Sequence, residues 1–133
     1  MTRKEIFAEM EREFGRVPVF FKEVAEEVLE LEWRLFKKGE LEEGPVPKKY
    51  MQLIGLGIAA ATKCPYCTHF HSEMARLHGA SREEIQTTIL QARGVAGWST
   101  YMHGAQQDLH EFKEDVRKIR DYIVERESRK AAA

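Results

Sequence analysis

The chain has 133 residues, of which 43% are hydrophobic and 32% are charged, with 21 basic and 22 acidic side chains. These values are typical of one globular domain, and a formal net charge of −1 provides no general attraction for nucleic acid. The charged start of the chain predicts no secretory signal peptide, and the longest apolar stretch, Met51 to Ala61, is too short to cross a bilayer. We therefore expect a cytoplasmic protein with no nucleic-acid partner and no membrane partner.

The first predicted element is a short amphipathic helix. Thr2 and Glu5 have the spacing of a capping box, in which each residue satisfies a backbone N–H near the other. Apolar residues then recur at helical intervals over residues 6–14, and Gly15 follows, where a helix commonly ends.

A second helix is predicted from Pro18 to Gly39, because apolar residues again follow a helical period and glycine often ends a helix. Its predicted buried face consists of Val17, Phe20, Phe21, Val24, Val28, Leu31 and Leu35. Residues 39–47 are rich in glycine, proline and glutamate and are predicted to connect this helix to the next one.

The third predicted helix, from Pro47 to Thr62, is apolar on nearly all sides, which predicts a central buried position. Gly57 and the three alanines at 59–61 would allow a neighbouring helix to approach closely. A fourth helix is predicted from Cys64 to Gly79.

Two further helices complete the prediction. A second capping box, Ser-x-x-Glu at 81–84, opens a helix whose pattern is interrupted at Gly94 and Gly97. Asp108 can cap a last helix, which we expect to fray beyond Tyr122, where the chain is strongly charged. No convincing strand alternation is present, so the predicted fold class is all-α.

The Cys64-Pro-Tyr-Cys67 pair, followed by His71, is the most chemically suggestive feature of the sequence. A thiol at a helix start is favoured as thiolate by the free backbone N–H groups and the helix dipole, so Cys64 is predicted to be the more acidic cysteine. His71 is four residues beyond Cys67, on the same helical face, where an imidazole can accept a thiol proton. The pattern therefore indicates an activated dithiol.

Three other interpretations of this segment remain open. A thioredoxin-like motif requires a βαβ pattern, which is missing here. A zinc site could use His69, but that residue lies about 200° around the helix from Cys67, and no second ligand pair has finger-like spacing. Both cysteines could also be small core residues without chemistry.

A longer pattern surrounds the motif. The run Ile-Gly-Leu-Gly-Ile-Ala-Ala-Ala-Thr-Lys-Cys-Pro-Tyr-Cys-Thr-His-Phe-His, which ends at His71, is followed by Gly-Ala-Ser-Arg-Glu-Glu-Ile at 79–85. Together they resemble the AhpD-like/carboxymuconolactone decarboxylase family, closely over residues 47–90 and more loosely to residue 107. The resemblance implies a single-domain, all-helical AhpD-like bundle that forms a homotrimer or homohexamer. It also suggests residues 1–44 as an N-terminal helical arm of the same domain, and residues 45–133 as the core with a charged C-terminal helix.

The resemblance implies specific catalytic roles. Cys67 would attack a peroxide, Cys64 would close the disulfide and His71 would relay the proton. The redox branch of the family typically has a glutamate where this chain has Gln52, which can orient a partner but cannot take a proton at neutral pH. Base catalysis would then depend on His71 alone or on a carboxylate from elsewhere in the chain.

The predicted function is that of a thiol–disulfide oxidoreductase with alkylhydroperoxidase activity, acting on a small hydroperoxide or disulfide. It would need no bound cofactor or metal, but it would need an external reductant, either a protein or a small thiol. Tyr66 and His103 are candidates for lining the substrate pocket, although His103 also fits a hydrogen-bonded core position. The alternatives are a lactone decarboxylase, which would not need the dithiol, and a non-catalytic redox-sensing or zinc-binding oligomer.

Overall fold

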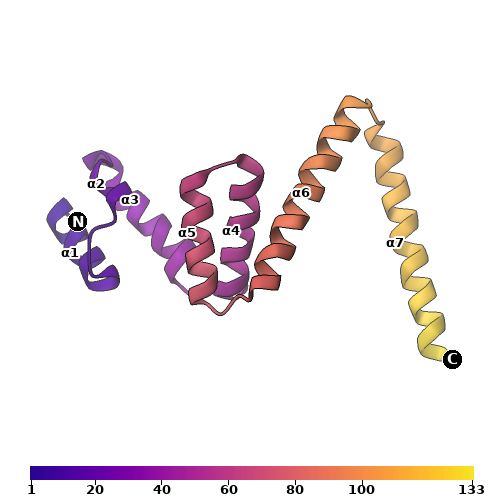
Figure 1. The fold of residues 1–133 in the computed structure, drawn as a ribbon, viewed down its shortest axis with the longest axis horizontal. Coiled ribbons are helices and arrows are strands. Elements are labelled where there is room, and N and C mark those ends of the chain that lie inside the picture. Colours follow the sequence, from indigo (N-terminus) through magenta and orange to yellow (C-terminus); the bar gives the residue numbers. More distant parts are fainter.

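The computed structural model describes residues 1–133 and consists of helices and short connections (Figure 1). The elements are α1 (Arg3–Phe14), α2 (Val19–Lys22), α3 (Glu26–Phe36), the π-helical turn η1 (Lys37–Leu41), α4 (Lys48–Thr62), α5 (Pro65–Leu77), α6 (Arg82–Gly104) and α7 (Leu109–Ala132). The predicted all-α class is confirmed. None of the helices is both long enough and apolar enough to span a membrane.

The predicted helix starts at Thr2, Ser81 and Asp108 are confirmed by their hydrogen bonds. Thr2 and Ser81 each form a reciprocal capping box, and the Asp108 side chain accepts a hydrogen bond from the backbone N–H three residues on. Gly15 ends α1 at a φ of 72°, a left-handed conformation that glycine adopts without steric cost.

The prediction of one helix from Pro18 to Gly39 is wrong. The chain leaves the helix after Lys22 and re-enters it at Glu26, and Arg3 of α1 binds the backbone carbonyls at this break. Its guanidinium donates to the carbonyl of Lys22 at 3.3 Å and to that of Val24 at 2.7 Å. Gly39 does not end a helix either, since it lies inside the π-helical turn.

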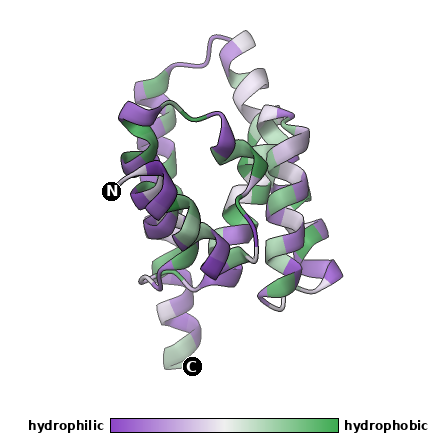
Figure 2. Ribbon diagram, turned by 90° about the vertical axis from the view of Figure 1, so that its left-hand side faces the viewer, coloured by the Kyte–Doolittle hydropathy of each residue, from purple (hydrophilic) through white to green (hydrophobic).

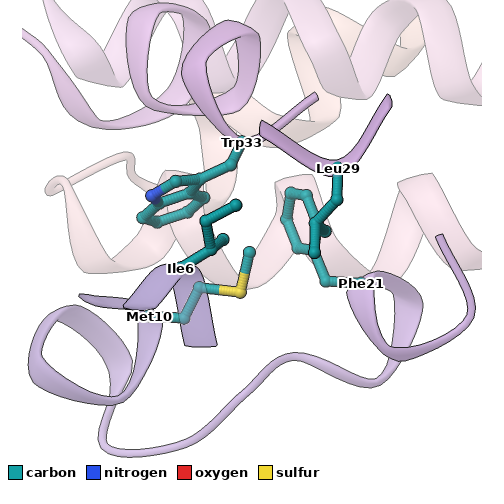
Figure 3. Close-up of a cluster of buried hydrophobic side chains, with 5 residues drawn as sticks. All are labelled: Ile6, Met10, Phe21, Leu29 and Trp33. Atoms are coloured by element: carbon teal, nitrogen blue, oxygen red, sulfur yellow. The ribbon is translucent and has the colours of Figure 1, made fainter. Parts of the chain in front are cut away.

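The predicted buried face of this region is confirmed in part. Phe21 is buried and Val17 and Val24 pack against the same cluster. The other four predicted residues are exposed, and a different pair from α3 enters the core: the exposed residues are Phe20, Val28, Leu31 and Leu35. The first hydrophobic cluster joins α1, α2 and α3 and consists of Ile6, Met10, Phe21, Leu29 and Trp33 (Figure 3). The break after α2 explains the change, because it resets the helical register between Phe21 and the residues of α3.

A second cluster holds α4 against α5 and α6, and consists of Leu53, Leu56, Ala75 and Ile85. Helix α4 is central in position, as predicted, but it is not buried on all sides. Tyr50, Ile54 and Ile58 are 49–60% exposed on its remaining face. Figure 2 shows hydrophobic and hydrophilic segments alternating along the helices.

The last two helices are longer and more regular than predicted. Gly94 and Gly97 lie inside α6, since a glycine costs a helix only about 1 kcal/mol relative to alanine and need not end it. Helix α7 continues through the charged end of the chain, where ion pairs such as Arg129–Glu125 lie one turn apart. Helix α6 packs against α4 through Ile85, whereas α7 extends away from the other elements (Figure 1).

Candidate active site

The two cysteines lie at the first turn of α5. Cys64 is the N-cap residue, and its sulfur accepts a hydrogen bond from the backbone N–H of Cys67 at 3.3 Å. Pro65 occupies the first turn, where its missing N–H removes no helical hydrogen bond. Both thiols are free, with Cys64 half-buried and Cys67 exposed. The turn therefore presents a reduced dithiol to solvent.

The two thiols differ in acidity because of their mutual contact. Hydrogen bonds from the Cys67 thiol and from the Cys67 backbone N–H lower the pKa of Cys64. The pKa of Cys67 is raised, since its thiol donates to Cys64 and lies next to the charge that Cys64 acquires. The two groups titrate as a pair, and the first thiolate forms at Cys64.

His71 lies on α5, one turn beyond Cys67, and its ring points toward α4. Its Nδ1 is 2.8 Å from Oε1 of Gln52, and its ring packs edge-on against Phe70 at a centroid distance of 5.1 Å. His71 forms no hydrogen bond to either sulfur in this state. The structure thus brings Gln52 and His71 together, and it brings Cys64 and Cys67 together, with one helical turn between the two pairs.

Gln52 is 1% exposed, and both ends of its amide are occupied. Its Nε2 donates to Oε2 of Glu40 at 2.8 Å, while its Oε1 faces His71. Glu40 belongs to the π-helical turn η1, which comes before α4. A carboxylate from another part of the chain is therefore connected to His71 through the amide.

A glycine on α4 makes room for the imidazole. A Cβ atom at Gly55 would lie 2.5 Å from Nδ1 and Cε1 of His71, far inside van der Waals contact. Gly55 is three residues after Gln52, so both lie on the face of α4 toward α5. The close approach predicted at Gly57 is looser, because a Cβ there would be 3.6 Å from the nearest atom, on Thr88.

The structure does not bring the other predicted residues into this constellation. Tyr66 is next to the dithiol in sequence but is 85% exposed. His103 is exposed in the last turn of α6 and its side chain forms no hydrogen bond, so in this chain it is not a hydrogen-bonded core histidine. His69 lies with Cys64 along an exposed groove beside α5. No group of three or more His, Cys, Asp or Glu side chains is arranged to hold a metal ion.

These features define an all-helical protein with a dithiol at a helix start and, one turn away, a half-buried imidazole hydrogen-bonded to a buried amide. The chain matches the model of the carboxymuconolactone decarboxylase family over residues 23–107, and it belongs to this family. The crystal structure of the alkylhydroperoxidase AhpD core from Rhodospirillum rubrum superimposes with a TM-score of 0.71, covering 80% of this chain and 81% of that one. At 20% identity, this similarity shows the AhpD-like fold.

Two curated relatives match shorter regions. An uncharacterized protein of the cox locus of Paracoccus denitrificans is 34% identical over 61 residues, which are 46% of this chain and 55% of that protein. An alkyl hydroperoxide reductase of Mycobacterium tuberculosis is 31% identical over 88 residues, which are 65% of this chain and 25% of that protein. The matches thus span about half and a quarter of the lengths of these relatives.

Two residues of the site, Glu40 and Gly55, were not predicted from the sequence. Glu40 is one of several glutamates in a segment that was predicted to be a connection, and nothing in its local pattern distinguishes it. Gly55 had a usable signal, since a glycine inside a helix is costly and this one lies one turn from Gln52. A glycine on that face indicates a place where another side chain can pack against α4.

The two glycines of α4 provide a matched pair of substitutions. We expect Gly55→Ala to lower the free energy of unfolding by about 1–3 kcal/mol, because the new methyl group collides with the His71 ring. Gly57→Ala should raise it by about 0.5–1 kcal/mol, since its methyl group meets only ordinary contacts. Urea unfolding followed by circular dichroism measures both values. Equal effects would show that His71 does not pack on Gly55.

The contact between the thiols predicts how Cys64→Ser changes the titration of Cys67. Removing the Cys64 thiolate removes a neighbouring negative charge, so the pKa of Cys67 should fall below its value in the intact pair. Ultraviolet absorbance of the thiolate, recorded against pH, should show two steps for the reduced wild-type protein. The variant should show one step, below the higher wild-type step. If the single step of the variant lies at or above the higher wild-type step, the assigned contact between the two thiols is contradicted.

Proposed function

We propose that this chain is a thiol–disulfide oxidoreductase with alkylhydroperoxidase-type activity that uses Cys64 and Cys67 as its redox centre. The observation that supports this proposal most is the free dithiol at the start of α5, with a half-buried, hydrogen-bonded imidazole one turn away. The family and the fold are compatible with this chemistry, and one relative is named as an alkyl hydroperoxide reductase. A lactone decarboxylase would have no need for the paired thiols.

The proposed reaction begins when His71 takes the proton of Cys67. The Cys67 thiolate attacks the terminal oxygen of the hydroperoxide, forming an S–O bond and breaking the O–O bond. The alkoxide that leaves receives the proton from His71 and departs as an alcohol. The Cys64 thiolate then attacks the sulfenic acid on Cys67, forming the S–S bond and releasing water once the oxygen is protonated.

The proposed order, in which Cys67 attacks and Cys64 closes the disulfide, agrees with both the exposure and the acidity of the two thiols. Cys67 is the more exposed thiol and has His71 one turn beyond it, which favours it as the attacking group. Cys64 has the lowered pKa, so it is the thiol that more readily supplies the second thiolate for closing the disulfide.

The disulfide would be reduced by an external dithiol, which supplies two electrons and two protons, so the cycle needs no bound cofactor. Thiol–disulfide exchange at the same exposed pair would allow a disulfide as an alternative substrate. We also propose that the chain works as a homotrimer or homohexamer. In support, α7 carries an exposed apolar series that a second copy could cover: Leu109, Phe112, Val116, Ile119 and Ile123.

Single-cysteine variants test both the function and the order of attack. We expect Cys67→Ser to abolish consumption of cumene hydroperoxide in the presence of dithiothreitol. Cys64→Ser should still react once and leave a sulfenic acid on Cys67, which dimedone labels and mass spectrometry locates. Labelling of Cys64 in the Cys67→Ser variant would reverse the order, whereas no reaction in the wild type or in either variant would reject the function.

A further inference from the structure

Gln52 is a buried amide with a defined direction. One side faces Glu40 and the other faces His71, each at 2.8 Å. An ionised carboxylate can only accept hydrogen bonds, so the amide must turn its NH₂ group toward Glu40. The amide oxygen therefore points to His71. Glu40 thus determines which end of the Gln52 amide the histidine meets.

The direction of the amide determines the state of the imidazole. An amide oxygen only accepts hydrogen bonds, so Nδ1 of a neutral His71 must carry the hydrogen. The other ring nitrogen, Nε2, then keeps its lone pair and can accept a proton. This is the tautomer that a proton acceptor needs when its Nδ1 is already engaged with the protein.

We propose that Glu40 is a positioning residue that locks His71 in the Nδ1–H tautomer through Gln52, which leaves Nε2 as the proton acceptor for the dithiol. The proposal rests on the function proposed above. When Nε2 takes the Cys67 proton, Nδ1–H continues to donate to Gln52. The Glu40 carboxylate, at the far end of the polarised amide, then stabilises the positive imidazolium.

The position of Glu40 is itself held by the N-terminal helices. Lys37, the first residue of η1, forms an ion pair with Glu9 of α1 at 2.8 Å. The second oxygen of Glu9 accepts a hydrogen bond from the buried Trp33 at 2.9 Å. A π-helical turn is rare and frequently occurs at functional sites, and here it brings Glu40 to Gln52. The hydrogen-bonded series Glu40–Gln52–His71, called the lock below, therefore joins η1, α4 and α5. Contacts with α1 and α3 hold its first member in place.

Glu40→Gln tests the lock with almost no change in shape. A glutamine at position 40 can either donate or accept, so the Gln52 amide can turn over and the preference of His71 for Nδ1–H is lost. Nitrogen-15 NMR of histidine-labelled protein reports the tautomer without any turnover, and a His71→Gln variant assigns the signals among the five histidines. Glu43→Gln, a neighbouring exposed carboxylate with no hydrogen-bond partner, is the matched control.

The double variant Glu40→Gln with Gln52→Glu moves the carboxylate next to His71. It should restore the Nδ1–H tautomer, since an ionised glutamate at position 52 only accepts. We expect the wild type, the double variant and the Glu43→Gln control to show the Nδ1–H signal, and Glu40→Gln to show a mixture. Peroxide consumption by Glu40→Gln should fall on the order of 10-fold, as with outer partners that orient metal-bound imidazoles.

The two readouts separate this proposal from the proposed function. An Nε2–H signal in the wild type, an unchanged tautomer in Glu40→Gln or an unrestored one in the double variant would each overturn the lock. The expected tautomer pattern in a protein that consumes no peroxide would establish the lock and reject the proposed function. A loss of activity in Glu40→Gln without a change in tautomer would contradict the lock, because Glu40 would then act by another route.

Discussion

The site depends on one constraint, which is that a buried amide must have both of its ends hydrogen-bonded. Gln52 meets this requirement by connecting Glu40 on one side with His71 on the other. Leaving either end unpaired would cost about 1–3 kcal/mol, so the turn η1, helix α4 and helix α5 are held in one arrangement. The orientation of the imidazole beside the dithiol follows from this arrangement.

The N-terminal helices consequently contribute to the site as well as to the fold. Their own hydrophobic cluster is separate from the cluster of α4, α5 and α6. Two sets of contacts join the two regions: the Glu40–Gln52 hydrogen bond, and the packing of Phe70 against Phe20 and Phe36 at centroid distances of 6.5 and 6.1 Å. The family match also begins within this region, at residue 23.

Local chemistry allowed much of the fold to be predicted from the sequence, because capping boxes, helical periods and the Cys-x-x-Cys-x-x-x-His motif are encoded by neighbouring residues. The errors arose where distant residues decide the outcome. Arg3 binds the backbone carbonyls at the break after α2, and Glu40 reaches the amide of Gln52. These two contacts have no local pattern, so a single sequence does not reveal them. Gly55 differs, because a glycine inside a helix is itself a signal, although the His71 ring that packs on it is known only from the structure.

The central claim is that Cys64 and Cys67 form a redox pair served by His71. Intact-mass analysis of the fully reduced protein after one equivalent of cumene hydroperoxide tests it most directly. The account predicts the loss of two hydrogens, a peptide map that joins Cys64 to Cys67, and one equivalent of the corresponding alcohol. Two unmodified thiols with the peroxide left intact would contradict it.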